Sequence, residues 1–190
     1  MTNIVIVYHS GYGHTQKQAA AVKVGAESVA GVNVKLFAID KDGELPETTW
    51  QELAEAHAII FGSPTYMGSV SWQFKKFADA SSKMWFTQNW KDKLAAGFTN
   101  SATINGDKLS TLHYLFTLAM QHSMLWISTG IMPSNTKAAE RNDINYLGSY
   151  SGLIAQSPSD ASPEEGPLPG DLATAEKFGE RIATIAKQWK

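Results

Sequence analysis

The 190-residue chain is 43% hydrophobic and 18% charged, with a formal net charge of −2, which is the composition of an ordinary soluble globular protein. This charge gives no electrostatic basis for binding nucleic acid or an anionic membrane. Because the chain has no cysteine, disulfides, thiolate metal sites and a cysteine nucleophile are excluded, and no metal site is expected. No apolar stretch approaches the roughly 20 residues of a membrane helix. The N-terminus has no secretory pattern, so a cytoplasmic protein is expected.

Short apolar runs alternate with helical patterns along the whole chain. Runs of this kind are typical of strands covered on both faces. The helix that begins near Thr49 has a capping-box spacing from Thr49 to Glu52. In chain order, strands are expected at residues 3–8, 32–39, 57–62, 94–99 and 124–128, and helices at residues 14–30, 48–56, 69–82, 108–121 and 171–190.

Three of these helices have an apolar stripe that is expected to face the sheet. The stripes consist of Val70, Phe74, Phe77 and Ala78 in the third helix, Leu109, Leu112, Phe116 and Met120 in the fourth, and Leu172, Ala175, Phe178, Ile182, Ile185 and Trp189 in the last.

Five strand–helix units in one chain predict an α/β fold, a doubly wound three-layer sandwich that forms a single domain over residues 1–190. A closed eight-stranded barrel would need a longer chain, about 250 residues. Residues 130–170 have no clear period, and a loop of this length is usually functional or an interaction element.

Three loops that follow strands are dense in glycine and in hydroxyl or amide side chains. They read HSGYGHT (9–15), GSPTYMGSVS (62–71) and NSATINGD (100–107). In an open parallel sheet, ligands bind beyond the carboxyl ends of the strands. The three loops are therefore expected to share one binding site.

The first loop has the features of a phosphate cradle. It leads into a helix N-terminus, which offers unpaired N–H groups and the positive end of the helix dipole, and Ser10 and Thr15 flank its glycines. Since residues 9–16 contain no lysine or arginine, neutral donors would hold the phosphate. A simpler interpretation is that the hydroxyls only cap helices.

Known motifs narrow the choice of ligand. The P-loop string is absent, so an ATPase or GTPase is not expected. The dinucleotide fingerprint is half met, since Gly11 and Gly13 are followed by Gln16, although Asp40 lies where a ribose-binding acid would be. Flavin mononucleotide (FMN), with one phosphate and a planar ring, needs one such cradle and two further loops.

The strings YHSGYGHT, IIFGSPTYMGSVSWQFKKFAD and LAMQHSM together resemble the WrbA-type NAD(P)H:quinone oxidoreductases of the flavodoxin-like superfamily. The similarity spans essentially the whole chain, with the same order and spacing in all three loops. The resemblance implies a flavodoxin-like fold whose five parallel strands have the order 2-1-3-4-5.

The resemblance also implies a set of FMN contacts. The first loop would wrap the phosphate and the near edge of the flavin, the second would approach the pyrimidine side of the ring, and the third would border its other end. The implied residues are Ser10, Gly11, Tyr12, Gly13, His14 and Thr15, then Pro64, Thr65, Tyr66, Met67 and Gly68, and finally Ser101, Ala102, Thr103, Asn105 and Gly106.

Three residues are implied in catalysis: Tyr12, His122 and Trp85. His122 would face the flavin from a partner subunit, and Trp85 would form a wall of the substrate pocket. Each has an alternative from the residues themselves, because His122 could cap the end of a helix and Trp85 could be a core or surface anchor. His113 is expected on a solvated helix face, and His57 is expected to be structural.

The implied activity is two-electron hydride transfer from NADH or NADPH to a quinone or another planar acceptor by ping-pong turnover, in a homo-oligomer, a dimer or tetramer. Three alternatives share the fold: a one-electron flavodoxin carrier, a regulatory FMN-binding module without turnover, and an NADPH-dependent FMN reductase. Flavodoxin carriers are usually strongly acidic, and a net charge of −2 disfavours that alternative.

Overall fold

The computed structural model describes residues 1–189, in which strands and helices alternate. No helix in this part of the chain is long and apolar enough to cross a membrane. The strands are β1 (Thr2–His9), β2 (Val32–Ile39), β3 (Ala58–Tyr66), β4 (Ser69–Val70), β5 (Leu94–Ser101), β6 (Leu125–Trp126) and β7 (Leu153–Gln156). The helices are α1 (His14–Glu27), α2 (Thr48–Glu55), α3 (Trp72–Ala80), α4 (Ser82–Phe86), α5 (Lys108–Gln121) and α6 (Pro169–Gln188).

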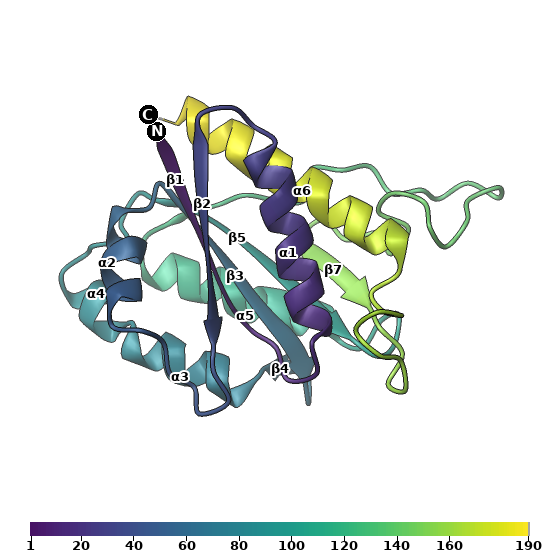
Figure 1. Ribbon diagram of the computed structural model, residues 1–190, viewed down its shortest axis with the longest axis horizontal. Coiled ribbons are helices and arrows are strands. Elements are labelled where there is room, and N and C mark those ends of the chain that lie inside the picture. Colours follow the sequence, from purple (N-terminus) through teal and green to yellow (C-terminus); the bar gives the residue numbers. More distant parts are fainter. Residues whose placement is uncertain (190) are drawn as a thin grey trace.

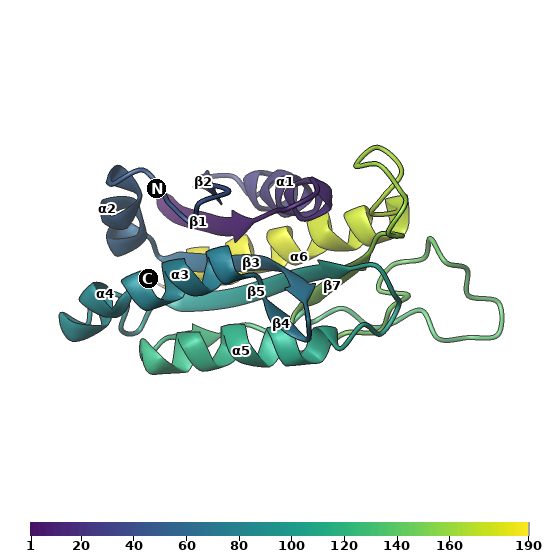
Figure 2. The same ribbon diagram turned by 90° about the horizontal axis from the view of Figure 1, so that it is seen from below.

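The central sheet has the parallel strand order β2-β1-β3-β5, with β6 and β7 both pairing in parallel with β5. Counted by position, this is the expected flavodoxin-like order 2-1-3-4-5. Consecutive residues of β1 alternate between two apolar cores. One core lies under α1 and α6, and the other lies under α2, α3 and α5, which gives the three layers visible in Figure 2.

The expected fifth strand over residues 124–128 was wrong in its extent. Only Leu125 and Trp126 pair with the start of β5, while β7 pairs with its end, Phe98–Ser101. Between them, Gly130 adopts a left-handed conformation (φ 62°), which an extended strand does not accommodate. The chain leaves the sheet there and extends away from it before returning at β7 (Figure 1).

Several helix boundaries also differ from the expectations. Helix α1 ends at Glu27, where the Ser28 hydroxyl donates to the Gly25 carbonyl. The predicted capping box is absent, because α2 already includes Thr49, whose side chain is buried. Residues 69–70 form β4, a short hairpin with the end of β3, and α3 begins only after Ser71, whose hydroxyl accepts the N–H of Phe74.

The stripe expected on α3 is buried, and α6 buries the centre of its stripe while Trp189 is exposed. The stripe expected on α5 was wrong. Leu109, Phe116 and Met120 are exposed, and the buried face is one step around the helix, at Thr111, Leu112, Leu115 and Ala119. Leu112 belongs to both the expected stripe and the buried face. Because apolar residues lie on the exposed face of α5 as well as on its buried face, the apolar pattern did not show which face meets the sheet.

Candidate functional site

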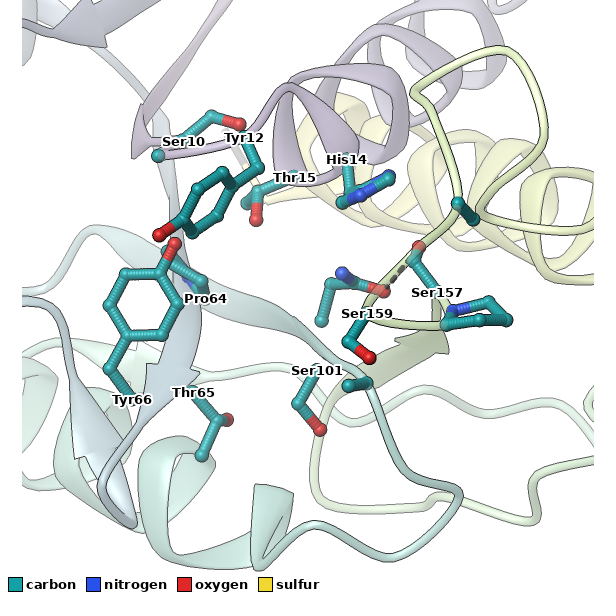
Figure 3. Close-up of a pocket in the computed structure, with 15 residues that line it drawn as sticks. Ser10, Tyr12, His14, Thr15, Pro64, Thr65, Tyr66, Ser101, Ser157 and Ser159 are labelled. Atoms are coloured by element: carbon teal, nitrogen blue, oxygen red, sulfur yellow. Dashed lines mark hydrogen bonds between the residues drawn. The ribbon is translucent and has the colours of Figure 1, made fainter.

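A cavity of about 530 Å³ lies at the carboxyl edge of the sheet, which is a typical volume for a small-ligand site. Its walls come from the loop after β1, the end of β3, the end of β5 and the segment after β7 (Figure 3). The sequence-predicted residues that line it are Ser10, Gly11, Tyr12, His14, Thr15, Pro64, Thr65, Tyr66, Ser101 and Ala102. Segments from all three predicted loops therefore meet at one cavity.

The hydroxyl of Ser10 organises the first loop. Its oxygen accepts the backbone N–H of Gly13 at 3.1 Å and of Gln16 at 3.2 Å. Gly13 has φ 89°, a left-handed conformation that a glycine adopts without strain, and it is the residue before α1. Helix geometry leaves the N–H groups of His14 and Thr15 without partners in α1. Both residues line the cavity, so its wall includes a helix N-terminus suited to an anion.

A segment that the sequence did not assign to the site closes this end of the cavity. Ser157, Pro158, Ser159 and Ala161 line the wall beside the first loop. His14 is hydrogen-bonded to the same segment, because its Nδ1 lies 2.9 Å from the carbonyl oxygen of Gly166 and must be the donor. The segment therefore packs directly against the helix N-terminus.

The missed residues had a weak signal in the sequence. The string SPSDASP (157–163) is rich in serine and proline. It lies at the carboxyl edge of the sheet only because the strand that precedes it, β7, pairs with the end of β5. Asn100, also missed, lines the cavity and accepts a hydrogen bond from the Ser157 hydroxyl at 3.1 Å, drawn as a dashed line in Figure 3.

Tyr12 and Tyr66 lie next to each other on one side of the cavity, with their hydroxyls directed toward one another (Figure 3). Their ring centroids are 6.4 Å apart, in an edge-to-face arrangement. Burial, together with the neighbouring Tyr12, raises the pKa of Tyr66 above its usual value, so the Tyr66 hydroxyl stays protonated near neutral pH. Because Tyr12 is 77% exposed, its ring is available to a planar ligand.

Two hydroxyl groups at the cavity differ in whether they already have a hydrogen-bond partner within the protein. The Thr65 hydroxyl is already committed, since it is 2.8 Å from the hydroxyls of both Thr99 and Thr111. The Ser101 hydroxyl is buried and has no hydrogen-bond partner within residues 1–189, although Ser101 lines the cavity. A polar ligand would satisfy it. Helix N–H groups, neutral hydroxyls and an exposed aromatic ring together fit FMN, which has one phosphate and a planar ring.

Some predicted residues lie beside the cavity instead of lining it. Gly13 does not line the cavity, but its N–H donates to the Ser10 hydroxyl within the first loop. Met67 and Gly68 form the turn between β3 and β4, both with positive φ, and Met67 is fully exposed. Thr103, Asn105 and Gly106 continue the third loop beyond Ser101 and Ala102, and none of the three is among the lining residues.

His122 and Trp85 do not line the cavity of their own chain, and their expected roles toward a partner subunit and a substrate pocket stay predictions. Helices α4 and α5 end at the amino edge of the sheet, opposite the cavity (Figure 2). His122 is 5% exposed, packs on Trp90 with ring centroids 4.2 Å apart, and its Nε2 lies 2.9 Å from the Ser81 hydroxyl. Trp85 lies half exposed on α4, beside Phe86.

Because His122 is buried, its pKa is lowered to about 4. The unfolded chain then binds a proton between pH 6.5 and 4 that the native state does not, so stability falls as the pH drops through this range. From pH 7.5 to 5 this residue should cost about 2 kcal/mol of the free energy of unfolding. Urea titrations at both pH values should show a smaller pH dependence for His122→Gln than for the parent, and His113→Gln, at an exposed site, should match the parent.

Other candidates from the sequence have clear structural roles. An oxygen of the Asp40 carboxylate accepts the backbone N–H groups of Asp42 and Glu44, and it therefore closes its own turn after β2 instead of facing the cavity. These bonds hold the pKa of Asp40 below its usual value. His57 is structural as expected, because its Nδ1 accepts the N–H of Asn3 at 3.1 Å.

The chain is similar to known proteins over most of its length. Residues 13–138 match the family model "NADPH-dependent FMN reductase". The chain is 50% identical over 188 residues to "Flavodoxin FldP" of Pseudomonas aeruginosa, covering 99% of this chain and 98% of that protein. It is 34% identical over 203 residues to "NAD(P)H dehydrogenase (quinone)" of Geotalea uraniireducens, covering 96% and 97%. The crystal structure of a "flavodoxin, WrbA-like protein" from Agrobacterium tumefaciens superimposes with a TM-score of 0.81 at 49% identity, over 100% of both chains.

Proposed function

Because this chain belongs to the flavin-binding oxidoreductase family of NADPH-dependent FMN reductases and WrbA-like flavodoxins, we propose that it binds FMN in the 530 Å³ cavity and catalyses electron transfer from NADH or NADPH to a quinone. The observation that carries the proposal is the meeting of an anion-binding helix N-terminus and an exposed aromatic ring in one cavity. The quinone acceptor is supported by the relatives named NAD(P)H dehydrogenase (quinone), which align over 96% or more of this chain.

The residues of this chain supply binding and orientation. Bound FMN would supply the hydride chemistry itself. The N–H groups of His14 and Thr15 would hold the phosphate, with the Ser10 hydroxyl keeping their loop in place. The Ser101 hydroxyl would donate to a polar atom of the ligand, and the exposed ring of Tyr12 would stack on a planar substrate. The cavity walls contain no lysine or arginine within the described chain, so neutral donors would bind the phosphate.

A second candidate is an electron carrier that exchanges electrons with protein partners. It is favoured by the 50% identity to a protein named a flavodoxin. The homo-oligomer expected from the resemblance stays a prediction.

An anaerobic titration separates the two candidates. Protein loaded with FMN and desalted is titrated with NADH and then, in a fresh sample, with NADPH, while the flavin absorbance is recorded. A benzoquinone pulse follows. For the reductase, we expect one nucleotide to bleach the flavin in a single step and benzoquinone to restore it. Bound FMN that neither nucleotide reduces, but that dithionite reduces in two separate steps, would contradict the reductase and support the carrier.

A further inference from the structure

Lys108 is a buried cation that the proposed function does not yet explain. It is the first residue of α5 and is only 2% exposed. A positive charge is unfavourable at a helix N-terminus, and burial of a charged group is costly unless it is compensated. The nearby carboxylate of Asp171 offers little compensation, since both of its oxygens are bound by the guanidinium of Arg141 at 2.8 Å. Lys108 must therefore be stabilised by other groups.

The compensation comes from the third loop, residues 101–107. The Lys108 ammonium donates to the carbonyl oxygen of Thr103, to that of Ile104 at 3.1 Å, and weakly to that of Asn105 at 3.5 Å. The preceding carbonyl, of Ala102, accepts from the side-chain amide of Gln156 at 2.7 Å. Four consecutive carbonyls of this loop thus point toward donors from the protein.

This arrangement determines where the N–H groups of the loop point. In a planar trans peptide, the N–H points opposite to the carbonyl of the same unit. The N–H groups of residues 103–106 are therefore turned away from Lys108 and Gln156. The loop also folds back on itself, because Gly106 packs against the Ser101 side chain at the cavity wall.

We propose that Lys108 is a positioning residue for the flavin, because it holds the carbonyls of residues 103–105 and thereby sets how Ser101 and Ala102, which line the cavity, meet the edge of the ring. The inference rests on the proposed binding of FMN in the cavity. Lys108 itself acts through the loop and does not need to touch the ligand.

The charge on Lys108 makes this role depend on pH. Burial lowers the pKa of Lys108 to about 8; Asp171 opposes that shift and Arg141 adds to it. The other charged group beside it is Asp107, the preceding residue. Loss of the proton weakens the hydrogen bonds to the carbonyls, so FMN affinity should fall as the pH rises through 8. The free energy of unfolding of the apoprotein should instead rise over the same pH range. The reason is that the native state then no longer buries a charge that the unfolded chain keeps.

The test is FMN titration followed by fluorescence quenching at pH 7 and pH 9. We expect the Kd of the parent to rise about tenfold between the two pH values. The Kd of Lys108→Met should be about tenfold above the parent at pH 7 and insensitive to pH, and Lys108→Arg should recover most of the affinity at both pH values.

Lys93 is the matched control. Its ammonium also donates to two carbonyls, of Ala54 at 2.8 Å and Ala56 at 2.6 Å, and burial also lowers its pKa, but it precedes β5 at the opposite edge of the sheet. Lys93→Met should keep both the affinity and the pH profile of the parent.

The outcomes separate this inference from the proposed function. If the parent binds FMN and Lys108→Met binds it equally well at both pH values, the positioning role is wrong while the FMN site stands. If the parent does not bind FMN, the proposed function itself fails. Should Lys108→Met unfold under the assay conditions, as judged by circular dichroism, the pH profiles of the parent and of Lys108→Arg decide, since a structural role alone predicts no loss of affinity above pH 8.

Discussion

Gly13→Val should raise the Kd for FMN on the order of 100-fold and leave a desalted protein without flavin. The reason is the backbone of the first loop. Gly13 has φ 89°, and a β-branched residue held there is strained by roughly 1–3 kcal/mol. A Cβ at this position would also lie 2.6 Å from Pro163, in the segment that closes the cavity. The variant must release the strain by changing the loop that presents the N–H groups of His14 and Thr15.

Gly31→Val is the control for this variant. Gly31 has φ 83°, so the backbone strain is nearly the same, but a Cβ there meets no atom within 4 Å and the residue lies in the turn before β2. It should lower the melting temperature without changing the Kd for FMN. The measurement is fluorescence quenching of FMN, together with thermal unfolding of each apoprotein. Equal Kd values for Gly13→Val and the parent would show that the first loop does not hold the phosphate.

Asp171→Ala should reduce the free energy of unfolding by about 3–5 kcal/mol, which is the usual cost of removing one partner of a buried ion pair. The Asp171 side chain is 4% exposed, and its carboxylate accepts hydrogen bonds from Nη1 and Nη2 of Arg141 and from the backbone N–H of Gln156. The substitution leaves the Arg141 charge and the Gln156 N–H without this acceptor. Since Gln156 is the last residue of β7, the loss also weakens the fifth position of the sheet.

Asp79→Ala tests the same chemical change at the surface. Asp79 pairs with Lys75 one turn away on α3, and both side chains are at least half exposed, so the loss should be under about 1 kcal/mol. Urea unfolding at pH 7, with one slope for all variants, gives the comparison. A cost for Asp171→Ala no larger than for Asp79→Ala would mean that the buried pair contributes little to the native state.

The first loop shows how far the sequence alone could predict the site. Ser10, Gly13 and Thr15 follow a strand and precede a helix, and these positions have local consequences: a hydroxyl that caps, a glycine with positive φ and a helix N-terminus. The structure contains all three. His122 shows the opposite case. Its position after α5 was predicted, but its burial against Trp90 and Ser81 depends on residues some 30 to 40 positions away in the chain.

The sequence by itself determined the alternation of strands and helices, the doubly wound architecture and the shared edge of the three loops. These follow from local apolar patterns and from the right-handed crossover, which leaves the carboxyl ends of parallel strands together. Only the tertiary structure decided that the fifth sheet position is divided between β6 and β7, that residues 157–161 close the cavity, and that Lys108 holds the third loop. Each of these depends on a strand pairing or a buried polar contact whose partner is chosen by packing of the whole chain, and no local pattern of residues specifies that choice.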